Sequence, residues 1–104
     1  MNLTILERIT LLELLPDRGS LTTMRVLRDL QRDIGFTEDE LREAKIEQVD
    51  GQITWNPEAD PMKDIGLGDA GRKIILDGLK KKDAAEQITP PMLALWERLT
   101  GDEE

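Results

Sequence analysis

Three threonines carry the signals of helix starts, and they favour a mostly helical fold for this chain. Thr4 and Thr37 are each followed three residues later by a glutamate, which is the pattern of a capping box. Thr89 precedes Pro90, and proline is favoured at the first position of a helix. Apolar residues spaced to cover one helix face follow Thr4 and Thr89, and Phe36 can pack on Leu41 across the cap at Thr37, so helices are expected at all three.

Stop signals divide the remaining periodic segments. Pro16 ends the first helix, and Gly35 is expected to end the second in a left-handed conformation. Asp69 is expected to cap a further helix that ends in three consecutive lysines. The predicted helices run from Thr4 to Pro16, from Ser20 or Thr22 to Asp33, from Thr37 to Ala44 or Lys45, from Asp69 to Lys82, and from Thr89 to Gly101.

The segment between the third and fourth helices is predicted to form a hairpin. Residues 46–49 and 52–55 flank Asp50-Gly51, a pair typical of a two-residue type I′ turn. With that turn one face of the hairpin is expected to pack on the helices, and it carries Ile46, Ile53 and Trp55.

These elements predict a mostly α fold with one β-hairpin and five helices. Three helices followed by a hairpin is the order of a winged helix, and two C-terminal helices are added to it. With 104 residues, the chain is expected to form a single domain over 1–104. Residues 56–64, with Pro57 and Pro61, are expected to be an irregular connector, and 102–104 a solvated acidic tail.

The composition argues against catalysis. Cysteine and histidine are absent, which removes disulfides, the commonest transition-metal ligands and the usual general base. Asp60, Asp64 and Asp69 resemble a hard-cation site, but their spacing does not fit a calcium-binding loop. We therefore expect a protein that is not an enzyme and has no metal and no cofactor.

Residues 66–71 spell the dinucleotide-binding pattern G-x-G-x-x-G ahead of a helix. No buried strand precedes them, and Asp69 would place a carboxylate where the phosphates bind. The sequence favours a loop and a helix start at this segment.

The net charge of −8 is concentrated in the middle of the chain. Residues 36–64 carry nine acids against three bases, whereas residues 1–35 carry five of each. A negative field favours basic protein surfaces and repels nucleic acid and anionic membrane. The leading hypothesis is a protein-binding module for a basic protein surface, with neither nucleic acid nor membrane as a partner. Its acidic surface comprises Glu38, Asp39, Glu40, Glu43, Glu47 and Asp50.

An alternative hypothesis uses the basic residues around the second helix. This arginine cluster would contact DNA in a winged-helix transcription regulator, or it would remain a solvated face with internal ion pairs such as Arg25–Asp29. A third hypothesis is a virion structural subunit, which would form homo-oligomers. The arginine cluster comprises Arg18, Arg25, Arg28 and Arg32.

Several segments resemble small uncharacterised phage and prophage proteins. They are residues 3–8, 14–16, 21–30, 65–68, 74–75 and 95–99, with Trp96 where a smaller aromatic is expected. The resemblance implies a phage accessory protein that engages a host or virion protein, and it implies no enzymatic activity. Charges interrupt the apolar start of the chain, so a secretory signal is not expected, and the protein is placed in the host cytoplasm or the virion.

Overall fold

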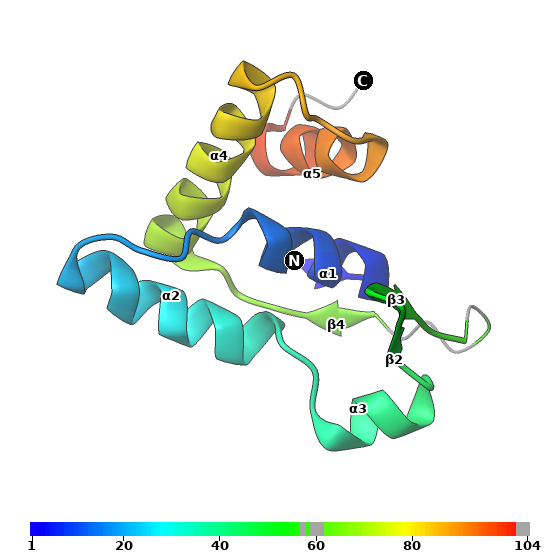
Figure 1. The fold of residues 1–104 in the computed structure, drawn as a ribbon. Coiled ribbons are helices and arrows are strands. Elements are labelled where there is room, and N and C mark those ends of the chain that lie inside the picture. Colours follow the sequence, from blue (N-terminus) through cyan, green and yellow to red (C-terminus); the bar gives the residue numbers. More distant parts are fainter. Residues whose placement is uncertain (57, 59–61, 102–104) are drawn as a thin grey trace.

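Helix α1 (Ile5–Leu14) lies at the centre of the molecule, where it contacts α2, α4, α5 and strand β1 (Figure 1). The structure is a computed structural model, and it describes residues 1–56, 58 and 62–101. Thr4 caps α1 through the predicted capping box, in which its hydroxyl accepts from the Glu7 amide. The breadth of its apolar surface explains why α1 is covered on several sides. Leu6 is the exception to this surface, since it remains 44% exposed.

The helices form in the predicted order. Helix α2 (Leu21–Ile34) is capped by Ser20, and α3 (Glu38–Glu43) begins at the capping box of Thr37. Helix α5 (Pro90–Thr100) begins at Thr89 and ends at Gly101, whose φ of 75° is left-handed. Together with α4 (Gly68–Ala84), the described residues contain five helices, which confirms the predicted mostly helical fold.

The hairpin also forms where it was predicted. Strand β2 (Glu47–Val49) pairs antiparallel with β3 (Gln52–Thr54), and Gln48 lies opposite Ile53. Asp50 and Gly51 both have positive φ, 52° and 78°, as a type I′ turn requires. Ile46 and Trp55 pack on the helices as expected, whereas Ile53 remains 42% exposed.

Three expectations about helix ends are wrong. Gly35 ends α2 in an extended conformation, with φ −62° and ψ 168°. In this conformation the Gly35 carbonyl accepts a hydrogen bond from the Arg8 side chain of α1. Asp69 does not cap α4, because the helix starts at Gly68 and Leu67 occupies the cap position without a side-chain hydrogen bond. The helix also continues past the three lysines to Ala84.

The connector after the hairpin contains a short strand that was not predicted. Strand β4 (Lys63–Asp64) pairs antiparallel with β1 (Asn2–Leu3), with Asn2 opposite Asp64. The amino group of Met1 also donates to the Asp64 carboxylate at 2.8 Å. Pro57 and Pro61 of the expected irregular connector, and the acidic tail 102–104, lie outside the described residues.

The apolar side chains form a main core and a smaller cluster. The main core joins α1, α2, α4 and α5 and includes Leu11, Leu30, Ile75 and Leu95. The smaller cluster comprises Ile5, Ile9 and Ala44, with Phe36, Ile46 and Trp55 packed against it. The smaller cluster attaches α3 and the hairpin to one end of α1.

Candidate functional site

Helix α3 displays the first part of the acidic surface. Thr37 accepts a hydrogen bond from the Glu40 amide at 3.2 Å and donates its own amide to the Glu40 carboxylate at 3.0 Å. Glu38 and Asp39 lie in the first turn, where negative charge complements the helix dipole. Both are exposed, as is Glu43 one turn later. The cap therefore fixes the start of a helix whose carboxylates face solvent.

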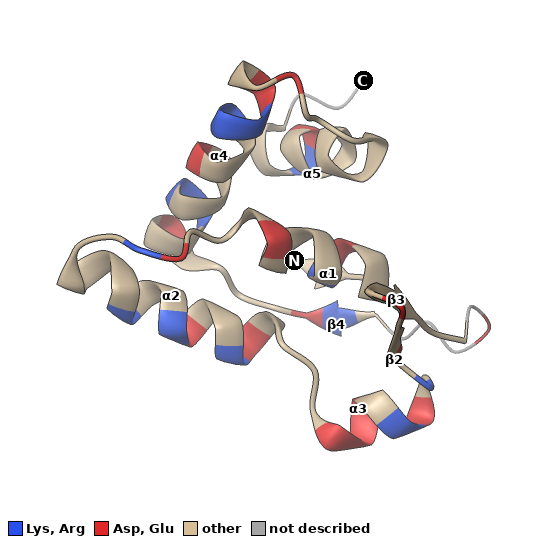
Figure 2. Ribbon diagram, in the orientation of Figure 1, with Lys and Arg blue, Asp and Glu red and all other residues tan. Residues whose placement is uncertain are grey.

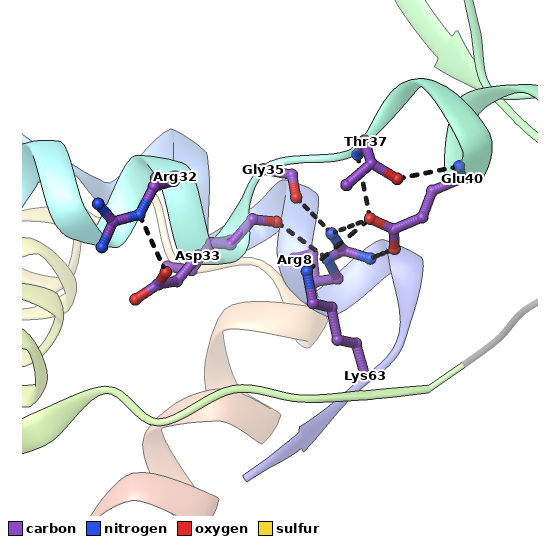
Figure 3. Close-up of polar contacts among 8 residues, drawn as sticks. Arg8, Arg32, Asp33, Gly35, Thr37, Glu40 and Lys63 are labelled. Atoms are coloured by element: carbon purple, nitrogen blue, oxygen red, sulfur yellow. Dashed lines mark hydrogen bonds and ion pairs between the residues drawn. The ribbon is translucent and has the colours of Figure 1, made fainter.

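Glu40 does not belong to the accessible part of this surface, which corrects the sequence hypothesis. Its carboxylate accepts two hydrogen bonds from the Arg8 guanidinium (Figure 3). The hydrogen bond from Arg8 is the main reason that the pKa of Glu40 is lowered from 4.5 to about 2. Lys63 approaches the same carboxylate at 3.9 Å. Glu40 is thus a structural residue that faces into the molecule.

Arg8 is fully buried on α1 and connects three segments of the chain. Its Nε donates to the Ile34 carbonyl at 2.9 Å, and its Nη2 donates to the Gly35 carbonyl (Figure 3). Its guanidinium also lies 4.1 Å from the centre of the Phe36 ring, within the range of a cation–π contact. Arg8 therefore holds the end of α2, the following loop and α3 against α1.

The other carboxylates of the acidic surface remain exposed. Asp39 forms an ion pair with Arg42 at 2.6 Å, and both side chains are more than 70% exposed, so the pair adds little stability. Within the described part of the chain, no ion pair is recorded for Glu38, Glu43 or Glu47. Asp50, at the hairpin turn, is likewise exposed and has none. These four charges remain available to a partner.

An apolar groove lies between α1, α3 and the hairpin, and of these four residues Glu47 lines it. It has a volume of about 420 Å³ and is also lined by Glu13, Glu47 and Gln48. Leu41 and Ile53 on its walls are 38% and 42% exposed, although both are large apolar residues. Its apolar lining comprises Ile9, Leu12, Phe36, Leu41, Ile46 and Ile53. The structure thus brings together an apolar recess and unpaired carboxylates.

The arginine cluster is divided between two places. Arg25, Arg28 and Arg32 lie on the exposed face of α2 (Figure 2). Arg32 lies 3.7 Å from Asp29 and 3.5 Å from Asp33, and Arg28 lies 3.6 Å from Asp29, whereas the expected Arg25–Asp29 pair is not recorded in the described residues. Arg18 precedes the helix and lines a different recess, next to α4. Arg18 therefore lines a recess that the three arginines of α2 do not line.

The glycine-rich segment has a structural role. Gly68 begins α4 with a left-handed φ of 69°, and Gly71 packs against Leu30 of α2. A dinucleotide fingerprint requires a buried strand that leads directly into the helix. Among the described residues the strand before α4 is β4, which ends at Asp64 and belongs to a two-stranded sheet, so this requirement is not met. The described residues contain no group of three or more potential ligands that could hold a metal ion, and Asp60 lies outside them.

Sequence reasoning missed Arg8 and the apolar groove. A signal for Arg8 was present, because it lies three residues after Ile5 and one before Ile9, within the apolar stripe of α1. The groove had a weaker signal, because Ile53 was expected to pack on the helices and nothing in the sequence indicated that Leu41 and Ile53 would both remain exposed. Only their shared exposure at the junction of three elements reveals the recess.

Comparisons with known proteins found no match, whether to a family model, to a curated protein or to a solved structure. None of the helices in the described residues has the length and apolar character needed to cross a membrane. The geometry of these residues is therefore the basis for a functional proposal.

Proposed function

We propose that this chain is a non-enzymatic module that binds a basic protein segment through the apolar groove and the acidic surface beside it. The setting we propose is that of a phage accessory protein engaging a host or virion protein. The observation that carries the proposal is an open apolar recess lined by Glu13 and Glu47, with the exposed Glu38 and Glu43 on α3, the helix that contributes Leu41 to its wall. Single exposed acids are common, but an apolar recess with carboxylates and without a lining base is suited to a specific partner.

The two features contribute differently to binding. Burying an apolar side chain in such a groove stabilises a complex by roughly 1.5–3 kcal/mol, so one or two anchors supply much of the affinity. The carboxylates at its edge increase the association rate of basic partners and disfavour acidic ones. The partner segment is therefore expected to carry apolar anchors flanked by lysine or arginine.

The DNA-binding alternative has weaker support. A helix that reads the major groove must approach phosphates, and α3 would present Glu38, Asp39 and Glu43 to them. Two of the three arginines exposed on α2 already have acidic neighbours. The virion-subunit alternative draws on no particular contact of the described residues, and we do not develop it.

The test uses a fluorescent peptide with leucines at i, i+4 spacing separated by lysines, and it measures anisotropy at low and moderate salt. The triple variant Glu38→Lys, Glu43→Lys, Glu47→Lys is expected to bind at least about tenfold more weakly, with a flatter salt dependence. The control triple variant Asp69→Lys, Asp83→Lys, Glu86→Lys changes the net charge equally at other exposed positions, and we expect it to retain binding.

Equal losses in the two triple variants would contradict the proposal, because net charge alone would then explain binding. Unchanged affinity of the first triple variant would also contradict it. Labelled duplex DNA provides the comparison for the alternative hypothesis. Salt-sensitive DNA binding that is abolished by Arg25→Glu and Arg28→Glu would favour the regulator instead.

A further inference from the structure

A second recess lies at the C-terminal end of α1, between the first turns of α2 and helix α4. It has a volume of about 440 Å³ and is lined by thirteen residues. Its floor is apolar and is formed by Leu14, Pro16, Val26 and Ile74. We call it the basic cleft because basic side chains line it, whereas acidic side chains line the apolar groove.

Close packing of two helices forms one wall of this cleft. Gly78 of α4 lies so near the end of α1 that an added Cβ would be 2.5 Å from the Leu14 carbonyl oxygen. Just beyond Leu14 the chain turns at Pro16 and leaves α1. The cleft is therefore part of the packed framework, since its floor and wall residues belong to α1, α2 and α4.

Four cations line the basic cleft: Arg18, Lys73, Lys81 and Lys82. Asp77 is the carboxylate that lines it with them. No ion pair is recorded for any of the four cations in the described part of the chain. Figure 2 shows Lys and Arg positions on α4 among Asp and Glu positions, in a chain whose net charge is −8.

The helix dipole explains only part of this clustering. Lys81 and Lys82 lie in the last turn of α4, where cations complement the helix end. Lys73 lies in the second turn of the same helix, and Arg18 comes from a separate segment, so the dipole at the end of α4 accounts for neither. Cations from two segments around an apolar floor indicate an anionic ligand that also has an apolar part.

We propose that the basic cleft binds an acidic peptide segment that inserts an apolar side chain. The apolar floor takes the anchor, and carboxylates beside the anchor meet Arg18 on one side and Lys81 or Lys82 on the other. The proposal concerns a different surface and a partner of opposite charge from the proposed function, and it does not depend on that function.

A peptide fits these observations better than a nucleic acid or a membrane does. A single-stranded nucleic acid binds with its bases stacked on aromatic rings, and no aromatic residue lines this cleft. An anionic membrane attracts broad basic surfaces, whereas here the four cations surround a recess in a protein of net charge −8. An acidic segment with an apolar anchor uses both the edge and the floor.

The experiment compares two peptides with leucines at the same i, i+4 spacing, separated by glutamates in one and by lysines in the other. Each is titrated into the ¹⁵N-labelled full chain, and amide shifts are followed by NMR. The glutamate peptide is expected to shift amides around Val26, Ile74 and Gly78, with an affinity on the order of 100 µM. A version with serine in place of leucine is expected to bind about tenfold more weakly, because it cannot fill the floor.

Charge-reversal variants locate the binding site. Arg18→Glu with Lys81→Glu is expected to weaken binding of the glutamate peptide about tenfold or more. Arg25→Glu with Arg28→Glu makes the same change in net charge on the exposed face of α2, and its effect is expected to be under about twofold. Circular dichroism melts of both double variants establish that each remains folded.

Three outcomes would overturn the proposal: no shifts at the cleft, equal weakening by both double variants, or cleft shifts caused by duplex DNA or anionic vesicles but not by the glutamate peptide. The lysine peptide separates this result from that for the proposed function. If only the glutamate peptide binds, the cleft proposal stands and the proposed function fails. If only the lysine peptide binds, the proposed function stands and the cleft proposal fails.

Discussion

The ion pair between Arg8 and Glu40 determines how α3 is attached to the rest of the molecule. Arg8 is 0% exposed, and the Glu40 side chain is 21% exposed. Withdrawing two charges from water is unfavourable, and the hydrogen bonds of Arg8 to Ile34 and Gly35 offset part of that loss. When one partner of such a pair is removed, the remaining buried charge destabilises the fold.

The substitution Glu40→Gln is therefore expected to lower the free energy of unfolding by about 3 kcal/mol. Glu38→Gln serves as the matched control, because Glu38 is exposed and has no recorded ion pair among the described residues, and we expect a change below about 0.5 kcal/mol. Urea denaturation followed by circular dichroism measures both. Similar small effects for the two variants would show that the Arg8 pair is not important for stability.

The lowered pKa of Glu40 predicts a pH dependence of stability. The pKa of Glu40 is about 2 in the folded chain and 4.5 when unperturbed, so the ionised form is stabilised by folding. This contribution is present above about pH 4.5 and is lost as the pH falls towards 2. In urea unfolding across this range, the stability difference between the wild type and Glu40→Gln should shrink as the pH falls. A constant difference would contradict the assignment.

Among the elements, α4 depends on close approach to its neighbours. Gly71 and Gly78 lie two turns apart on the side of α4 that packs against α2 and α1. An added Cβ at Gly71 would be 2.8 Å from Leu30 Cδ2, which is the end of a flexible side chain. At Gly78 it would meet the backbone carbonyl of Leu14, which cannot move without displacing α1. A Cβ at Gly71 thus requires only a side chain to move, whereas a Cβ at Gly78 requires the backbone of α1 to move.

This difference predicts an order of stability for alanine variants. Gly78→Ala is expected to be destabilised by about 2 kcal/mol despite the better helix propensity of alanine, because α4 and α1 must separate. Gly71→Ala should lose less, since Leu30 can change rotamer. Gly66→Ala is the control, because a Cβ there has no atom within 4 Å and should change stability by less than about 0.5 kcal/mol. Thermal melts rank the three, and a neutral Gly78→Ala would contradict the packing argument.

For the molecule as a whole, the main core and the smaller cluster are connected mainly through α1. Trp96 packs against the main core, and Trp55 packs against the smaller cluster. Each tryptophan therefore reports on a different part of the fold. Leu11 and Leu14 of α1 lie in the main core, while Ile5 and Ile9 lie in the smaller cluster, so the two parts share one helix.

Because of this shared helix, we expect a single cooperative unfolding transition. The variants Trp55→Phe and Trp96→Phe leave one tryptophan each, and in each variant the fluorescence midpoint should coincide with the far-UV circular dichroism midpoint. If Trp55 fluorescence changed at a lower urea concentration than the helical signal, the hairpin and α3 would be unfolding separately. The single-domain expectation would then be wrong.

Much of the secondary structure could be predicted because its signals are local. Thr37 and Glu40 form their capping box across three residues, and the Asp50-Gly51 turn joins adjacent strands. Such contacts depend on neighbours in the chain and therefore appear in the sequence. Gly35 and Asp69 show the limit of this reasoning: Gly35 caps α2 in an extended conformation, in which its carbonyl accepts from Arg8, and Asp69 lies within α4 and does not cap it. The pairing of Asn2 with Asp64 had no local signal at all.

The sequence by itself determined the helices, the hairpin and the concentration of acids in the middle of the chain. Only the tertiary structure decided which of those acids are available, because Glu40 is held by Arg8, which lies 32 residues earlier. It also decided where the two recesses lie, since each is lined by residues of three elements. The physical reason is that capping and turn formation act over a few residues, whereas burial of a charge or exposure of an apolar side chain depends on which distant segments pack together.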